Sequence, residues 1–380
     1  MLDRLKADLA ALRTAGQFRE LAAPLGIQLN SNDYLGLSDH PCLKRAVMQA
    51  LEEDDRFAST GSRLLSGNHE RWEDLEAGFA AFVEAEAALY FPSGYAANVG
   101  LLSSVLKPED IVFSDAANHA SIIDGIRLSQ ARKVVFPHLD LSFLEDALRK
   151  NVPGRKVIAV ESIFSMDGDH APLEELTALA DRFGASLIVD HGHSLGVEVR
   201  RQPSVFAAIY PCGKGLASVG GFVAGSQTLR DYLINHARSF IFSTALPPYC
   251  AAHVREAIAL VTAADAERAH LGEIGRYLRH KLRVAGFDIG RSDSQIVPVI
   301  LGTNETALHF AAAANAAGFA IRAIRPLTVP AGSARLRVSL NARLSTSDLD
   351  RFVETMLAAR AVGAVYDRAP SQESTKYARS

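Results

Sequence analysis

The sequence predicts an α/β protein with a mostly parallel central sheet and a smaller C-terminal α+β domain. Two observations carry this prediction. Short, almost continuous apolar runs alternate with helical patterns between about residues 41 and 250, as in successive βα units. A long helical stretch (248–286) then leads into a second group of apolar runs. We expect four regions: a helix and extended segment (1–40), the large domain (41–250), the α+β domain (251–368) and a polar tail (369–380).

Apolar periodicity defines the individual elements. Leucines at helical spacing among charged residues predict an amphipathic N-terminal helix: Leu2, Leu5, Leu9 and Leu12. The segment 27–37, rich in Asn, Asp and Gly, predicts a strand and a turn. In the large domain we expect strands at 86–91, 110–115, 133–137, 156–162, 185–190 and 220–225. In the smaller domain we expect them near 294–302, 319–324 and 334–340.

Composition excludes several classes of protein. The 380 residues are 48% hydrophobic and 22% charged, with a net charge of -3, so nothing favours general binding to nucleic acid or membrane. Three widely spaced cysteines fit neither a disulfide framework nor a zinc site, and we expect no metal. The N-terminus lacks an apolar signal core, and no run approaches the ~18 apolar residues of a membrane span. We therefore expect a cytoplasmic protein.

An acidic residue ends one of the predicted strands. Asp190 closes the run ASLIVD, and His193 follows three residues later. Open α/β sheets bind ligands at the carboxyl ends of their strands. Asp190 could therefore pair with a protonated ring nitrogen, and His193 could hydrogen-bond an oxygen on the same ring. The alternative is a turn-capping Asp followed by a surface His.

A lysine lies between two glycines. Gly213 and Gly215 would let a bulky group approach the ε-amine of Lys214 closely. Amines held neutral by burial or by nearby charge form Schiff bases, whereas a solvated turn is the alternative. The segment fails the phosphate-loop pattern GxxxxGK[ST], because Gly215 follows the lysine, and it fails GxGxxG. A nicotinamide dehydrogenase is therefore a poor fit.

Two segments could bind phosphate. Ser93, Gly94 and Tyr95 lie where a predicted strand passes into a helix, and the backbone N–H groups of a helix N-terminus bind anions. An ordinary strand-to-helix turn is the alternative. Ser243 and Thr244 precede two prolines, and their hydroxyls could hold a phosphate or cap a helix.

Other polar residues complete the set of candidates. His119 follows a predicted strand among small residues, which suits stacking on a flat ring as well as a structural role. Ser165 lies in a strand-to-turn passage and could donate to a cofactor oxygen or serve the turn. Arginines suited to a substrate carboxylate, or else exposed on the surface, cluster near the C-terminus: Arg325, Arg335 and Arg337.

Nine motifs in this order resemble the α-oxoamine synthase family, which are pyridoxal-phosphate (PLP) enzymes of fold type I, the aspartate aminotransferase-like fold. The resemblance covers most of the chain. The motifs are SNDYLGL, GSRLLSGNHERWEDLE, PSGYAAN, NHASIIDG, ESIFSMDGDHAPL, DHGH, GKGLASVGG, FIFSTALPP and TVPAGSARLR.

The resemblance implies catalytic roles for matching residues. Lys214 resembles the Schiff-base lysine, which also acts as the base on the amino-acid α-carbon. Asp190 resembles the partner of the pyridinium nitrogen. His193 and Ser165 resemble the donors to the phenolic oxygen, and His119 resembles the histidine stacked on the ring.

The resemblance also implies how the phosphate is held. Gly94 and Tyr95, next to Ser93, look like the phosphate turn. Thr244, with its neighbour Ser243, looks like the hydroxyl that the partner subunit lends to the phosphate. A homodimer with shared active sites is therefore expected.

The implied reaction is a decarboxylative condensation of a small amino acid with an acyl-CoA or acyl-carrier thioester. Arg337 resembles the arginine that grips the amino-acid carboxylate, with Arg325 nearby. Arg19 falls where an arginine suits the acyl end, and Asn32 of SNDYLGL joins the expected substrate site. The motifs TVPAGSARLR and ESIFSMDGDHAPL most favour L-alanine and a pimeloyl thioester, as in biotin synthesis.

The chain departs from the family pattern in several places, among them Trp72 where a His is common and a short segment between Arg19 and SNDYLGL, and other functions remain open. Pro211 stands where the family usually has Thr or Ser, so one phosphate contact is expected to be missing or replaced. The stretch from His193 to Lys214 is several residues shorter than usual. Alternatives are another amino acid or acyl-CoA within the family, including a signal-molecule synthase, a different PLP reaction such as transamination, and a non-catalytic partner subunit.

Overall fold

The computed structural model describes residues 1–150, 153–198 and 205–368, which form two compact units. We call residues 32–272 with 341–343 the sheet unit. Residues 1–31, 273–340 and 344–368 form the terminal unit. The predicted tail (369–380) lies outside the described residues.

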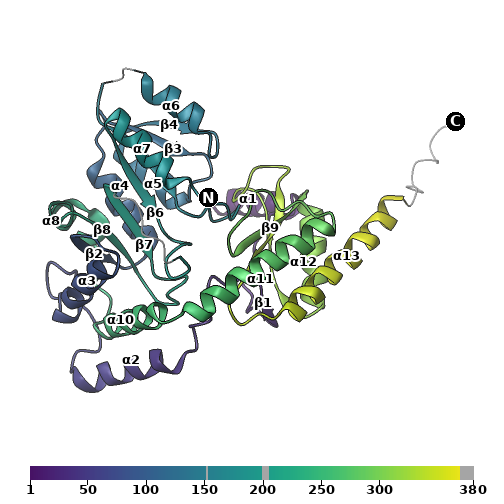
Figure 1. Cartoon of the computed structure of the whole chain (residues 1–380), viewed down its shortest axis with the longest axis horizontal. Helices are drawn as coiled ribbons and strands as arrows, with labels where there is room; N and C mark the ends of the chain where they lie inside the picture. The colour runs from purple at the N-terminus through teal and green to yellow at the C-terminus, as the bar shows by residue number, and fades with distance from the viewer. Residues whose placement is uncertain (151–152, 199–204, 369–380) are drawn as a thin grey trace. The chain divides into compact units, whose positions relative to one another are not determined.

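A seven-stranded sheet organises the sheet unit (Figure 1). Its strand order is β2-β8-β7-β6-β5-β3-β4, and within this sheet β8 runs antiparallel to both neighbours while the other pairs are parallel. This mostly parallel sheet confirms the predicted fold class. The strands are β2 (Ala87–Phe91), β3 (Ile111–Asp115), β4 (Arg132–Phe136), β5 (Lys156–Glu161), β6 (Ala185–Asp190), β7 (Ala207–Pro211) and β8 (Gly221–Gly225).

One strand of this sheet was missing from the sequence prediction. β7 is fully buried and lies between β6 and β8, directly before the turn that carries Lys214. Its run AAIYP ends in a proline, which argues against a central strand because proline cannot donate to the ladder. Pro211 is tolerated because it is the last residue of the strand, opposite Gly221.

Helices cover both faces of the sheet. Alternate residues of the central strands β3, β5 and β6 enter different cores: Ile158 of β5 packs in one cluster and Ala159 in the other. The first core is closed by α6 (Leu141–Arg149) and α7 (Leu173–Phe183). The second is closed by α4 (Gly94–Val105), α5 (Ala120–Ser129), α8 (Gln227–His236) and α9 (Arg238–Ile241).

The unit boundaries differ from those expected at residues 40 and 250. The helix α10 (Tyr249–Thr262) packs against α2 (Pro41–Glu53) and α3 (Glu70–Phe82), and it therefore belongs to the sheet unit. The following helix, α11 (Asp265–Val284), begins in the sheet unit and continues into the terminal unit. The expected long helical stretch is thus a helix pair.

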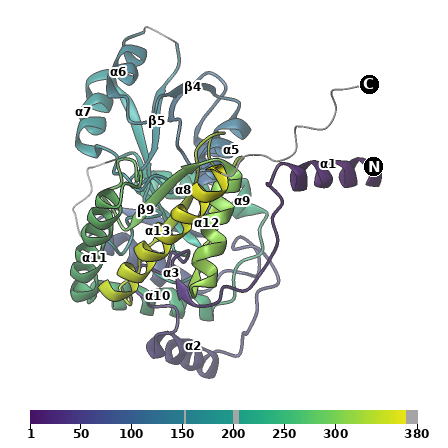
Figure 2. The ribbon, with the colours of Figure 1, turned by 90° about the vertical axis from the view of Figure 1, so that its right-hand side faces the viewer.

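The terminal unit contains a small antiparallel sheet of order β11-β12-β9. Helix α12 contacts this sheet, and α12 and α13 lie side by side (Figure 2). The N-terminal helix α1 forms as expected, and within the described residues no helix meets the length and apolarity of a membrane span. The elements are α1 (Leu2–Thr14), β1 (Ile27–Gln28), β9 (Ile296–Gly302), α12 (Asn304–Ala316), β10 (Phe319–Ala320), β11 (Ala323–Ile324), β12 (Ala334–Ser339) and α13 (Thr346–Arg368), with β1 parallel to β10.

Candidate active site

The carboxylate of Asp190 lies at the carboxyl end of β6, as the sequence predicted. Its side chain is buried and accepts two hydrogen bonds. The Asn98 amide donates to Oδ2 at 2.6 Å, and the Gly192 backbone N–H donates to Oδ1 at 2.8 Å. Both donors hold the carboxylate in a fixed orientation, in which it could face a cationic ring nitrogen.

Lys214 lies in the turn between β7 and β8, close to Asp190. The turn is closed by the Ala217 N–H, which donates to the Lys214 carbonyl at 2.7 Å. A Cβ placed on Gly192 would lie 2.5 Å from the Lys214 Nζ and 3.0 Å from the Asp190 Oδ1. The amine therefore lies over Gly192 beside the carboxylate, where any larger residue would displace it.

His119 is the N-cap of α5, and the residue remains partly accessible to solvent. The Nδ1 atom accepts the Ser121 backbone N–H at 3.3 Å and lies 2.7 Å from the Ser121 hydroxyl. Loss of hydration and then the Lys214 cation lower the pKa of His119, against the opposing effect of Asp190. The structure thus brings His119 within electrostatic reach of both predicted catalytic groups.

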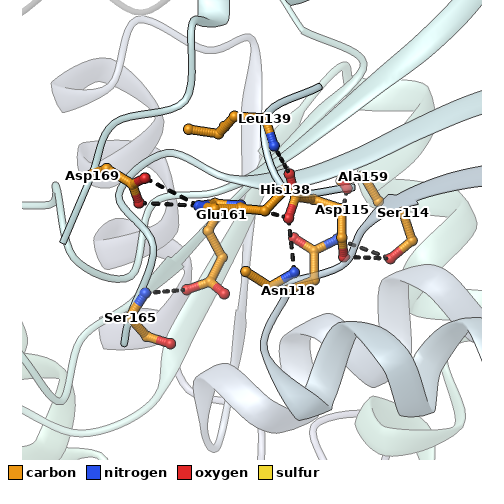
Figure 3. Close-up of polar contacts among 10 residues, drawn as sticks. Ser114, Asp115, Asn118, His138, Leu139, Ala159, Glu161, Ser165 and Asp169 are labelled. Atoms are coloured by element: carbon orange, nitrogen blue, oxygen red, sulfur yellow. Dashed lines mark hydrogen bonds and ion pairs between the residues drawn. The ribbon is translucent and has the colours of Figure 1, made fainter. Parts of the chain in front are cut away.

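Glu161 is a buried acid that the sequence analysis missed. It ends β5, directly opposite Asp190 in the parallel register. The Ser165 backbone N–H donates to its Oε2 at 3.3 Å (Figure 3), and the His119 backbone N–H also favours its charged form. Burial, followed by the Asp190 carboxylate, raises the pKa of Glu161 to about 8. Its place at the end of an apolar run, as for Asp190, was the signal that could have revealed it.

Three side chains tie the neighbouring strand ends together, and we call them the His138 cluster: Asp115, His138 and Asp169. The His138 Nδ1 lies 2.8 Å from Asp115, and its Nε2 lies 3.1 Å from Asp169 (Figure 3). Burial opposes the imidazolium, but the two carboxylate hydrogen bonds outweigh it and raise the pKa of His138 to about 9. The cluster links the segment before His119 to the turn that contains Ser165.

His193 is buried and contacts Tyr34, a second residue that the sequence analysis missed. The Tyr34 hydroxyl lies 2.5 Å from the His193 Nδ1 and 3.1 Å from the Asn32 Oδ1. Tyr34 is itself fully buried, so its hydroxyl fixes the orientation of the imidazole. The only signal in the sequence was the presence of Tyr34 within SNDYLGL.

The predicted phosphate turn begins helix α4. The Ser93 hydroxyl accepts the Ala96 N–H at 3.0 Å and caps the helix. A Cβ on Gly94 would lie 2.5 Å from the Cβ of Pro211, so glycine is required at this turn. Tyr95 is exposed, and its hydroxyl donates to an Asp124 carboxylate. Pro211 therefore packs against the turn instead of offering a hydroxyl to it.

The second predicted phosphate segment lies beside a small cavity. Ser243 and Thr244 line a space of about 20 Å³ together with Arg63 and Trp72, which is room for about one water molecule. Thr244 is exposed. Its expected role across a subunit boundary stays a prediction.

The substrate arginines belong to the terminal unit. The Arg337 guanidinium is buried and donates to the Ser339 hydroxyl at 2.5 Å. The Arg325 guanidinium donates to backbone carbonyls of residues 16 and 18, and burial followed by Arg19 lowers its pKa. Arg19 is 3.4 Å from the Thr328 hydroxyl. Arg325 thus anchors the N-terminal segment, and the substrate roles of these arginines stay predictions.

Another cavity lies elsewhere in the sheet unit. It measures about 750 Å³, and His191, Ser194 and Arg268 are among its lining residues. Burial lowers the pKa of His191 to about 3, so its imidazole is neutral. Among the described residues that line this cavity there is neither Lys214 nor Asp190, and the catalytic groups therefore identify the site better than cavity size does.

The residues around Lys214 fit pyridoxal phosphate. Gly192 leaves room beside the amine, Asp190 offers a fixed carboxylate to a cationic ring nitrogen, and a helix N-terminus follows Gly94. In addition, the buried Oδ1 of Asn98 has no hydrogen-bond partner within the described chain. A buried polar atom of this kind at a site is often satisfied by a ligand or by water.

Comparisons with known proteins agree with this geometry. The model of the aminotransferase class I and II family matches residues 25–356. An 8-amino-7-oxononanoate synthase from Geobacter sulfurreducens is 41% identical over 382 residues, covering 94% of this chain and 97% of the relative.

Two solved structures extend the comparison. A serine palmitoyltransferase from S. paucimobilis, with a bound PLP–myriocin aldimine, superposes with a TM-score of 0.86 at 28% identity, covering 95% of this chain and 98% of that one. An 8-amino-7-oxononanoate synthase from Francisella tularensis superposes with a TM-score of 0.78 at 26% identity, covering 90% and 99%. The protein therefore belongs to the aminotransferase class I and II family, in its α-oxoamine synthase branch.

Proposed function

We propose that this enzyme is an 8-amino-7-oxononanoate synthase of biotin synthesis, which condenses L-alanine with a pimeloyl thioester with loss of carbon dioxide. The cofactor is pyridoxal phosphate. The observation that carries the proposal is the Lys214 amine beside Asp190 at the carboxyl end of β6. The identity of 41% with the Geobacter sulfurreducens enzyme supports the choice of substrates.

Each residue of the candidate site has a separate role toward the cofactor. When bound, pyridoxal phosphate supplies an electron sink for the reacting carbon. The Asp190 carboxylate, held by Asn98, keeps the ring nitrogen protonated. The Lys214 amine holds the cofactor and moves the proton of the amino-acid α-carbon. His119 would cover the ring face, and His193 and Ser165 would donate to the ring oxygen, as the family resemblance implies.

Substrate binding is assigned to Arg337, Arg325, Arg19 and Asn32, as the family resemblance implies. Arg337 binds the amino-acid carboxylate, since a guanidinium fits a carboxylate with two parallel hydrogen bonds. Arg325 assists Arg337 in binding the amino-acid carboxylate. Arg19 attracts the distal carboxylate of the pimeloyl chain. These assignments rest on the family resemblance and on the buried position of Arg337.

The phosphate is bound by the turn at Ser93, Gly94 and Tyr95, and by the hydroxyls of Ser243 and Thr244 from the partner of a homodimer. The exposed position of Thr244 supports a role across subunits. The three cysteines are free thiols, in keeping with the reducing cytoplasm. The thioester carrier is CoA or an acyl carrier protein.

A second candidate is another condensation of the same branch, such as serine with palmitoyl-CoA. The superposition on a serine palmitoyltransferase at a TM-score of 0.86 favours it. The two candidates share Lys214 and Asp190, and they differ in the amino acid and in the acyl chain.

Release of CoA by the purified enzyme loaded with pyridoxal phosphate tests the proposal. Pimeloyl-CoA and palmitoyl-CoA are each offered with alanine, glycine or serine, and Lys214→Ala serves as the inactive control. Release with alanine and pimeloyl-CoA supports the proposal. Release with serine and palmitoyl-CoA alone replaces it with the second candidate, and release from neither thioester contradicts both.

A further inference from the structure

A continuous chain of hydrogen bonds joins the two groups expected to contact the cofactor ring. The Asn98 amide of α4 donates to the Asp190 Oδ2 at 2.6 Å and to the Ser121 hydroxyl at 3.0 Å. Ser121 of α5 in turn lies 2.7 Å from the His119 Nδ1. Asn98, Ser121 and Asp190 are buried, so water does not compete for these bonds.

This chain of hydrogen bonds determines which nitrogen of the His119 imidazole carries the proton. A backbone N–H can only donate, and the Ser121 N–H points at Nδ1. Nδ1 must therefore be unprotonated, and a neutral imidazole then carries its proton on Nε2. Reversing the Asn98 amide would turn its oxygen toward the Asp190 carboxylate, so the orientation of this link is also determined.

We infer that Asn98 and Ser121 hold His119 as a neutral imidazole with its proton on Nε2. Both are positioning residues, and their chain of hydrogen bonds ends on Asp190. The charged groups that face His119 are Lys214 and Asp190, with Glu161 behind its backbone N–H. Of these, the Lys214 cation opposes a second positive charge on the ring.

The consequence for catalysis rests on the proposed function. A neutral ring can lie against the cofactor without adding a positive charge beside the electron sink. Its Nε2–H remains a donor for an oxygen of the bound substrate, such as the amino-acid carboxylate. The same chain of hydrogen bonds couples the orientation of this donor to the carboxylate that faces the ring nitrogen.

Nitrogen NMR of the full-length protein with ¹⁵N-labelled histidine tests the tautomer directly, with and without pyridoxal phosphate. His119→Asn assigns the signals. The inference predicts a bare Nδ1 and a protonated Nε2 across the neutral pH range in the wild type. A proton on Nδ1, or a charged ring at neutral pH, overturns it.

The variant Ser121→Ala tests the positioning role, with Ser129→Ala as its matched control. Ser129 is a buried serine of the same helix whose hydroxyl donates to the Ile126 carbonyl, outside this chain of hydrogen bonds. Ser121→Ala should raise the titration midpoint of His119 by about one pH unit, because one hydrogen bond that favours the neutral ring is lost. Equal midpoints in the two variants contradict the positioning role.

Asn98→Leu separates this inference from the proposed function. In the loaded enzyme it should shift the pH titration of the cofactor absorbance, because Asp190 loses a donor. An unshifted titration contradicts the link to Asp190. Failure of the wild type to bind pyridoxal phosphate would overturn the proposed function, whereas the tautomer measured without cofactor would still stand.

Discussion

The charge on His138 makes a contribution to stability that disappears in alkali. Its pKa is about 9 in the folded chain, against ~6.5 for an unperturbed histidine. A folded pKa above the unfolded one means that the stabilisation is complete below pH ~6.5 and is lost as pH rises through about 9. The difference of roughly 2.5 units at ~1.36 kcal/mol each corresponds to about 3 kcal/mol, most of which is lost between pH 7 and pH 10.

The assay is denaturant unfolding of wild type and His138→Gln from pH 6 to pH 10. Trp72 is the only tryptophan of the chain and is buried in the sheet unit, so its fluorescence reports that unit. Glutamine can still form hydrogen bonds, but it does not titrate. The lysines, the tyrosines and Glu161 also titrate in this range, but both proteins contain them. Their contributions therefore cancel when the unfolding free energy of the variant is subtracted from that of the wild type. The free-energy difference between the two proteins should shrink by about 2–3 kcal/mol toward pH 10. A difference that stays constant over this range would refute the reasoning.

Three further substitutions test the geometry around the cofactor. Gly192→Ala places a methyl group 2.5 Å from the Lys214 Nζ and should weaken pyridoxal-phosphate binding at least about tenfold, measured by absorbance titration; unchanged affinity would place the amine elsewhere. In Gly94→Ala the added Cβ lies 2.5 Å from the Pro211 Cβ, so the turn must shift. The affinity for pyridoxal phosphate should therefore fall more than the affinity for pyridoxal, which has no phosphate. An equal loss of affinity for both would argue against a phosphate turn. Glu161→Gln should abolish the release of one proton on unfolding of the apoprotein between about pH 4.5 and about pH 8, because the buried carboxyl is protonated when folded and ionised when unfolded; an identical proton-release curve would show that Glu161 is ionised in the folded protein.

Sequence reasoning located the residues that end strands or interrupt them. Asp190 and Lys214 became candidates because one ends an apolar run and the other lies between glycines, and the order of the nine family motifs then favoured their cofactor roles over ordinary turns. The structure places these two side chains together. The strand before Lys214 was missed, since a run of five residues ending in Pro211 resembles a loop as much as a strand.

The supporting residues were harder to predict. Asn98 and Ser121 lie on helices, and nothing in their spacing reveals that α4 and α5 pack together and bring these side chains into contact. Arg325 was expected at the substrate, but its guanidinium holds backbone carbonyls of the N-terminal segment, a partner more than 300 residues away in sequence. Contacts of this kind depend on tertiary packing, which local patterns do not encode.

The central claim is that the Lys214 Nζ holds the cofactor beside Asp190. Reduction of the loaded enzyme with borohydride, followed by peptide mass spectrometry, tests it most directly, because reduction makes a lysine–cofactor Schiff base permanent. A pyridoxyl group is expected on the peptide that contains Lys214, and it should be absent in Lys214→Ala. Modification of a different lysine, or of none in an enzyme that still releases CoA, would contradict the account.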